Sequence, residues 1–124
     1  MDSRKVFFAS VFAALLVAGF SRADTASTTI KGYVIDSACT FTKSLKKPIS
    51  PECAVACAKA GSPLVIQTTA GNVYLPIDDA QPAKGQNDGL MPYAGQMVSV
   101  TGKVYQKGGA RAIVIEKIEA AGSK

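Results

Sequence analysis

The sequence predicts a small, mainly β protein: a five-stranded barrel with one short alanine-rich helix. Five short runs are rich in β-branched and aromatic residues, a composition that favours strands. These runs carry apolar residues on both alternating faces, which favours a closed or half-closed barrel over a flat sheet. The length of 124 residues, with 48% hydrophobic and 19% charged residues, is that of one globular domain.

The first 23 residues have the pattern of a secretory signal peptide. Arg4 and Lys5 precede an uncharged apolar run over 6–20, and Ser21-Arg22-Ala23 places small residues at the cleavage positions. The apolar run is shorter than the roughly 20 residues that a membrane-spanning helix needs. We therefore expect a signal peptide over 1–23, cleavage after Ala23, and a single mature barrel domain over 24–124. The mature chain is expected to be periplasmic or extracellular and free of the membrane.

The first strand and the helix are predicted from the start of the mature chain. The run over 28–36 is rich in β-branched and aromatic residues and predicts a strand. Residues 37–49 are expected to form a loop. Ser50 followed by Pro51 is a typical helix start, and Gly61 is a typical helix end, so a helix is expected over 51–60.

A hairpin and a long loop are expected next. Apolar runs over 63–69 and 73–77 are separated by Ala70-Gly71-Asn72, a turn sequence that indicates two paired strands. Residues 78–92 contain several prolines and glycines and predict a long loop.

The last two strands are predicted over 97–105 and 111–118. In the first of them Val98, Val100 and Val104 share one face, and Gly102 interrupts that row, as glycine does at a bulge or a sharp barrel bend. Five such strands with one helix favour the architecture of an oligonucleotide/oligosaccharide-binding (OB) barrel; another small barrel or a sandwich is the alternative.

Several function classes are excluded or disfavoured by composition. The chain has no histidine, which excludes Ser-His and Cys-His catalytic pairs, histidine-ligated zinc and haem attachment at C-x-x-C-H. The sequence contains no paired carboxylates, phosphate-binding loop or nucleophile elbow. We therefore expect no enzyme. The small positive charge left after signal cleavage and the exported address also disfavour a nucleic-acid partner; the partner is expected to be a small ligand or a protein.

Three cysteines form the candidate site: Cys39 after the first strand, and Cys53 and Cys57 one helical turn apart. The first interpretation is a structural disulfide, the usual role of cysteine in exported proteins, with no cofactor. Cys39 is expected to pair with a helical cysteine, with Cys57 slightly favoured because it lies mid-helix, and Cys53 as the alternative partner. A bond between Cys53 and Cys57 suits disulfide geometry poorly. On this interpretation the protein is a non-catalytic binding module.

The alternative interpretation is a copper site. Cys39, Cys53 and Cys57 together offer three thiolates, a ligand set that suits Cu(I), with Met91 or Met97 as a weak fourth ligand. Zinc prefers four firm ligands, which this chain does not offer without histidine. A third interpretation, redox chemistry at a free Cys53 in the first helical turn, lacks the C-x-x-C motif of thiol oxidoreductases.

Four segments carry a resemblance to known proteins. They are the stretch GYVIDSAC over 32–39, the pair Cys53-x-x-x-Cys57, the stretch YAGQMVSVTGKV over 93–104, and the motif GGxxAIVI over 108–115. Together they resemble a group of small exported bacterial proteins of uncharacterised function. Some members of that group have a histidine where this chain has Ser50. The resemblance implies an OB-like fold and the three-cysteine set, and it implies no reaction.

Overall fold

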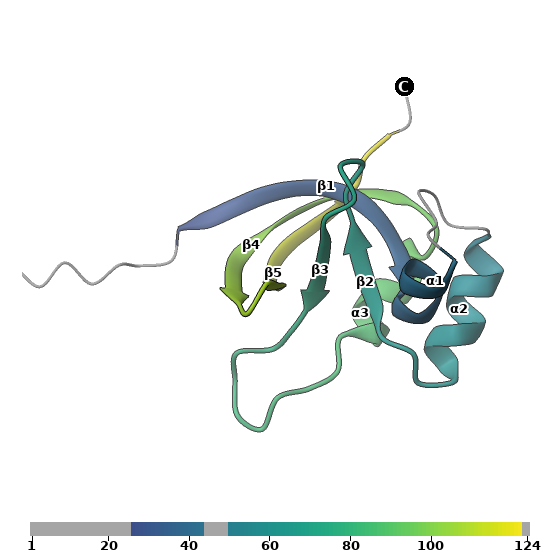
Figure 1. Ribbon diagram of the computed structural model, residues 1–124, viewed down its shortest axis with the longest axis horizontal. Coiled ribbons are helices and arrows are strands. Elements are labelled where there is room, and N and C mark those ends of the chain that lie inside the picture. Colours follow the sequence, from purple (N-terminus) through teal and green to yellow (C-terminus); the bar gives the residue numbers. More distant parts are fainter. Residues whose placement is uncertain (1–25, 44–49, 123–124) are drawn as a thin grey trace, which may run out of the picture.

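Five strands close into a barrel in the order β1-β2-β3-β5-β4 in the computed structural model (Figure 1). The structure describes residues 26–43 and 50–122. The contacts between neighbouring strands are antiparallel, except that β3 and β5 run parallel. The predicted small, mainly β barrel is therefore confirmed. The strands are β1 (Ser27–Asp36), β2 (Leu64–Gln67), β3 (Val73–Pro76), β4 (Met97–Lys107) and β5 (Ala110–Ala120).

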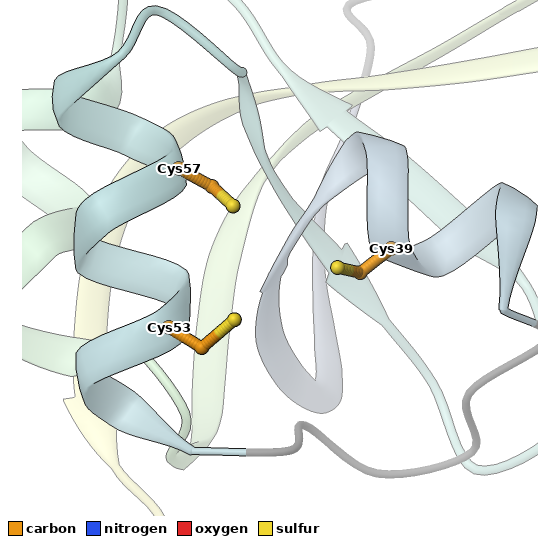
Figure 2. A group of neighbouring side chains, drawn as sticks. All are labelled: Cys39, Cys53 and Cys57. Carbon is orange, nitrogen blue, oxygen red and sulfur yellow. The ribbon is translucent and has the colours of Figure 1, made fainter.

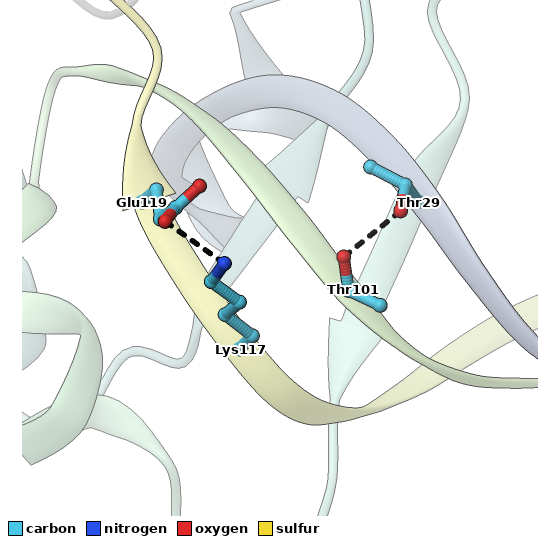
Figure 3. A network of polar contacts seen from close by, with 4 residues as sticks. All are labelled: Thr29, Thr101, Lys117 and Glu119. Atoms are coloured by element: carbon cyan, nitrogen blue, oxygen red, sulfur yellow. Dashed lines mark hydrogen bonds and ion pairs between the residues drawn. The ribbon is translucent and has the colours of Figure 1, made fainter.

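The long strands β1, β4 and β5 form one side of the barrel, with β4 between the other two. Thr29 and Thr101 are directly opposite across β1 and β4, and their hydroxyl groups are hydrogen-bonded at 2.8 Å (Figure 3). The register of β4 against β5 shifts between Thr101 and Gly102, so the predicted irregularity at this glycine is confirmed. A β-carbon at Gly102 would overlap the carbonyl oxygen of Val114, which explains why the bend requires glycine.

The barrel interior is aliphatic, as expected for a chain without tryptophan. α2 (Pro51–Lys59) contributes Ala54 and Ala58 to this core, and these small side chains let the helix lie close to the strands. Leu90 and Ala94 join the core from the segment between β3 and β4. The other core residues are Ile30, Val34, Leu64, Ile66, Val98, Val100 and Ile113.

The predicted helix over 51–60 is confirmed as α2, with Ser50 as its N-cap and Gly61 at a positive φ of 101° after its end. The structure also has helices inside both segments that the sequence analysis treats as loops. α1 (Ser37–Thr42) follows β1 directly, and α3 (Asn87–Leu90) and the 3₁₀ helix η1 (Met91–Tyr93) precede β4. The loop predictions over 37–42 and 87–92 are therefore wrong. α1 depends on its N-cap rather than on a run of helix-forming residues, and α3 and η1 are too short to show a helical pattern in the sequence. This is why the three helices were predicted as loops.

Two further predictions concern the start of the chain and the membrane. The predicted signal peptide over 1–23 and its cleavage site lie outside the described residues, so export stays a prediction. None of the helices within the described segments has the length and apolar character to cross a membrane.

Candidate metal centre

The three cysteine side chains converge at one end of the barrel, between α1 and α2 (Figure 2). Cys53 and Cys57 project from α2 toward Cys39, which projects back from α1. Their three Sγ atoms all lie within 4.8 Å of one another, and all three cysteines are free thiols. Residues that are far apart in the sequence thus form a single three-sulfur cluster.

The position of Cys39 is fixed by the junction of β1 and α1. Asp36, the last residue of β1, is the N-cap of α1, and its Oδ2 accepts a hydrogen bond from the Cys39 backbone N–H at 3.0 Å. The hydroxyl of Thr40 donates to the Asp36 carbonyl at 2.9 Å, and the Ser37 N–H donates to the Pro63 carbonyl at 2.8 Å. A short helix that would be unstable alone is therefore held to both β1 and the segment entering β2.

The other two sulfurs are fixed by the packing of α2. The Ser50 hydroxyl accepts a hydrogen bond from the Cys53 backbone N–H at 3.1 Å, which caps the helix. Because residues four apart share a helix face, Cys53 and Cys57 both point toward α1. Ala54 and Ala58, on the neighbouring face, pack into the barrel core and fix the rotation of the helix.

The side chain of Asn87, the first residue of α3, forms hydrogen bonds at the C-terminal end of α2. The amide nitrogen of Asn87 donates to the Ala58 carbonyl at 3.2 Å and to the Ser62 carbonyl at 2.9 Å. Its amide oxygen accepts from the Leu64 N–H at 2.8 Å. Asn87 therefore ties the end of α2, the connection after it and the start of β2 together, close to Cys57 in the chain.

The environment of the cluster raises the pKa of two of its thiols, those of Cys39 and Cys57. Cys39 is buried, and a hydrogen bond to the Asp36 carboxylate, then burial, then the negative charge of Asp36 raise the pKa of its thiol to about 11. Burial first, and then the charge of Asp36, also raise the pKa of the Cys57 thiol. Asp36 is itself 1% exposed, and its Oδ2 also accepts a hydrogen bond from the Ser62 hydroxyl at 3.4 Å. A thiophilic cation that replaced the thiol protons would be attracted by the same negative charge.

The structure brings together every cysteine that the sequence analysis named, without joining any pair. The predicted disulfide from Cys39 to Cys57, or to Cys53, therefore stays a prediction, as does the metal site. Met91, offered as a weak fourth ligand, packs against the barrel core, and Met97 lies in β4 opposite Tyr33 of β1. The arrangement can hold one soft metal ion in a three-sulfur site, or it can be oxidised to a disulfide and one thiol.

The sequence patterns do not predict α1 or the supporting roles of Ser62 and Asn87. One signal for α1 is present in the sequence: Asp36 stands three residues before Cys39, as Ser50 stands three residues before Cys53. In both helices the capping side chain accepts a hydrogen bond from the backbone of the cysteine three residues later. The same local motif therefore positions one cysteine on each side of the cluster.

No family model, curated protein or solved structure matches this chain. The resemblance to small exported bacterial proteins, which rests on short motifs, therefore stays a prediction.

Proposed function

We propose that this protein is a small exported, non-catalytic module that binds one Cu(I) ion through Cys39, Cys53 and Cys57. The observation that carries the proposal is the convergence of three free thiols, from two separately capped helices, to within 4.8 Å of one another. Export rests on the signal-peptide pattern of residues 1–23.

Ligand type and number favour copper in its reduced state. Soft thiolate ligands select Cu(I), zinc and iron–sulfur clusters over hard cations. A structural zinc site takes four ligands, and an iron–sulfur cluster is usually held by four cysteines. The chain has three cysteines and no histidine, so cysteine and histidine alone cannot complete a four-ligand site for either of these.

Binding would exchange protons for the metal ion. With the pKa of the Cys39 thiol at about 11 and that of Cys57 raised, these thiols are protonated at neutral pH. Loading one Cu(I) would break the S–H bonds of Cys39 and Cys57, form Cu–S bonds to all three sulfurs and release the displaced thiol protons to solvent, with no change in the oxidation state of sulfur or copper. The bound ion would also keep the thiols reduced in an oxidising compartment, where free thiols otherwise form disulfides.

A second candidate function rests on the same convergence of sulfurs. Oxidation of Cys39 with Cys57, or with Cys53, would link α1 to α2 and leave one thiol free. The protein would then be a disulfide-stabilised binding module without a metal. The two candidates differ in the number of free thiols in the mature protein and in its copper content.

A competition titration tests the proposal. The reduced protein is titrated anaerobically with Cu(I) in the presence of a chromophoric Cu(I) chelator. We expect one Cu(I) per chain, and a loss of affinity in each of C39S, C53S and C57S that exceeds the roughly 10–100-fold effect of losing an outer-shell partner. The control variant is A56S, which adds a hydroxyl to the exposed face of α2 and should leave the affinity unchanged.

Two results would decide against copper. If the reduced protein does not compete with the chelator, or if the three serine variants bind as the parent does, the cluster is not a Cu(I) site. Isolation of the mature protein with one free thiol, no metal and a Cys39 disulfide would favour the second candidate instead.

A further inference from the structure

A second candidate site is a hollow on the barrel wall whose lining residues include none of the three cysteines. It has a volume of about 410 Å³ and is formed by α1, the β2–β3 hairpin and the start of β5. Pockets of ~300–1,000 Å³ hold small-molecule ligands in proteins. Its lining includes Phe41, Val73, Leu75 and Arg111; we refer to this hollow as the Phe41 groove.

Most of the large hydrophobic side chains that are exposed in the described part of the chain lie in the Phe41 groove. Phe41 is 71% exposed and Leu75 is 43% exposed, and they are two of three large hydrophobic side chains exposed in the described part of the chain. Tyr105, the third, is not part of the groove. Exposed apolar side chains gathered in one hollow, rather than scattered singly, mark a binding surface.

The groove contains one charge, and it is positive. Arg111 is half-buried, and the lining includes no acidic residue. Within the segments 26–43 and 50–122 the one ion pair joins Lys117 to Glu119 on β5 (Figure 3), so the Arg111 guanidinium has no carboxylate partner there. A guanidinium is a rigid fork of donors that matches a carboxylate.

We propose that the Phe41 groove binds a free amphiphilic monoanion, such as a medium-chain alkyl carboxylate. The apolar tail would lie against Phe41, Val73 and Leu75, and the carboxylate would bind Arg111. A dissolved ligand fits better than an anionic membrane surface, because the site is concave and carries one cation rather than a cluster of lysines and arginines. This binding does not depend on the three cysteines, whose sulfurs lie between α1 and α2.

Octanoate binding followed by two-dimensional amide NMR and calorimetry tests the inference on the full mature chain. We expect saturable shifts confined to residues of the groove, and binding at least about tenfold tighter than that of octanamide or octylammonium. R111Q should weaken octanoate binding by about tenfold or more, because it removes a charge-assisted contact. F41A should weaken octanoate and octanamide alike, because it removes apolar contact with the tail.

Two matched variants control for general effects. K103Q removes a cation outside the groove, and Y105A removes an exposed aromatic ring outside it, so both should bind octanoate as the parent does. Equal affinity for octanoate, octanamide and octylammonium would overturn the inference, as would unchanged binding in R111Q. Binding to anionic vesicles without binding of octanoate would also overturn it. Because F41A and R111Q leave the thiols intact, Cu(I) affinity should not change in either variant, which separates this test from that of the copper site.

Discussion

Removing the side chain of Asn87 should destabilise the fold at the place where α2 is anchored. N87A deletes three hydrogen bonds: two donated to the carbonyls of Ala58 and Ser62, and one accepted from the Leu64 N–H. A neutral hydrogen bond contributes about 1 kcal/mol net, and Asn87 is half-buried, so water can partly replace the lost partners. We expect the free energy of unfolding to fall by about 2–3 kcal/mol, which corresponds to a Tm lower by roughly 10–20 °C in a domain of this size.

Urea denaturation followed by circular dichroism measures this change. N87D keeps the acceptor oxygen but places a carboxylate oxygen against the carbonyls of Ala58 and Ser62 in place of both donors, so its loss of stability should equal or exceed that of N87A. The control is Q106A, an exposed position on β4 without a side-chain hydrogen bond, which should change stability by less than about 0.5 kcal/mol. If N87A unfolds at the same urea concentration as Q106A, Asn87 does not anchor α2 and does not help to position Cys57.

Three further predictions concern the barrel bend, the thiol and the leader. G102A should cost about 1–3 kcal/mol or more, because the added methyl overlaps a backbone carbonyl, whereas G85A, with open space around it, should unfold like the parent. D36N should lower the pKa of the Cys39 thiol from about 11 toward its ordinary 9.0, visible in the ultraviolet titration of thiolate. Because the thiol ionises at lower pH in the unfolded chain than in the folded protein, the parent should lose stability as pH rises from 9.0 to about 11. D36N should flatten this decline, which urea denaturation across that pH range would measure. Intact mass of the protein from the cell that exports it should lack residues 1–23, and a full-length mass would show that cleavage after Ala23 does not occur.

The strands could be predicted because their signal is local. Alternating valines in β4 and the turn between β2 and β3 place apolar residues and chain reversals by periodicity and by backbone preference alone. Gly102 could be assigned to a bend because glycine within a strand has few other uses. The pairing of β3 with β5, which closes the barrel, joins residues far apart in the sequence. It follows from the predicted barrel fold and not from any local pattern.

The helices α1 and α3 could not be predicted by the same means. α1 has six residues, too few for a helix to be stable by residue preference alone. It depends on the Asp36 cap and on the hydrogen bond from the Ser37 N–H to the Pro63 carbonyl. α3 has four residues, and its first residue, Asn87, is held by contacts with the end of α2. Such contacts join residues far apart in the chain and leave no periodic trace in the sequence.

The members of the candidate site were predictable, but their arrangement was not. The spacing of Cys53 and Cys57 on one helix face follows from helix geometry, and the sequence named Cys39 as their partner. The distance between α1 and α2 depends on how Ala54 and Ala58 pack against the core. In the sequence, Asp36 at the end of a strand could orient a site, but an aspartate there usually makes a local turn bond. Its burial beside the thiols, which raises the pKa of Cys39, depends on the fold.

X-ray absorption at the copper edge, on the protein loaded with one equivalent of Cu(I), reports which atoms bind the metal. The proposal predicts a mononuclear ion with three sulfur ligands per chain, one each from Cys39, Cys53 and Cys57. C57S should then give a spectrum with fewer sulfur ligands, while the control A56S reproduces that of the parent. Copper bound by nitrogen or oxygen ligands, or an identical spectrum in C57S, would contradict the assignment of these three thiols as the copper site.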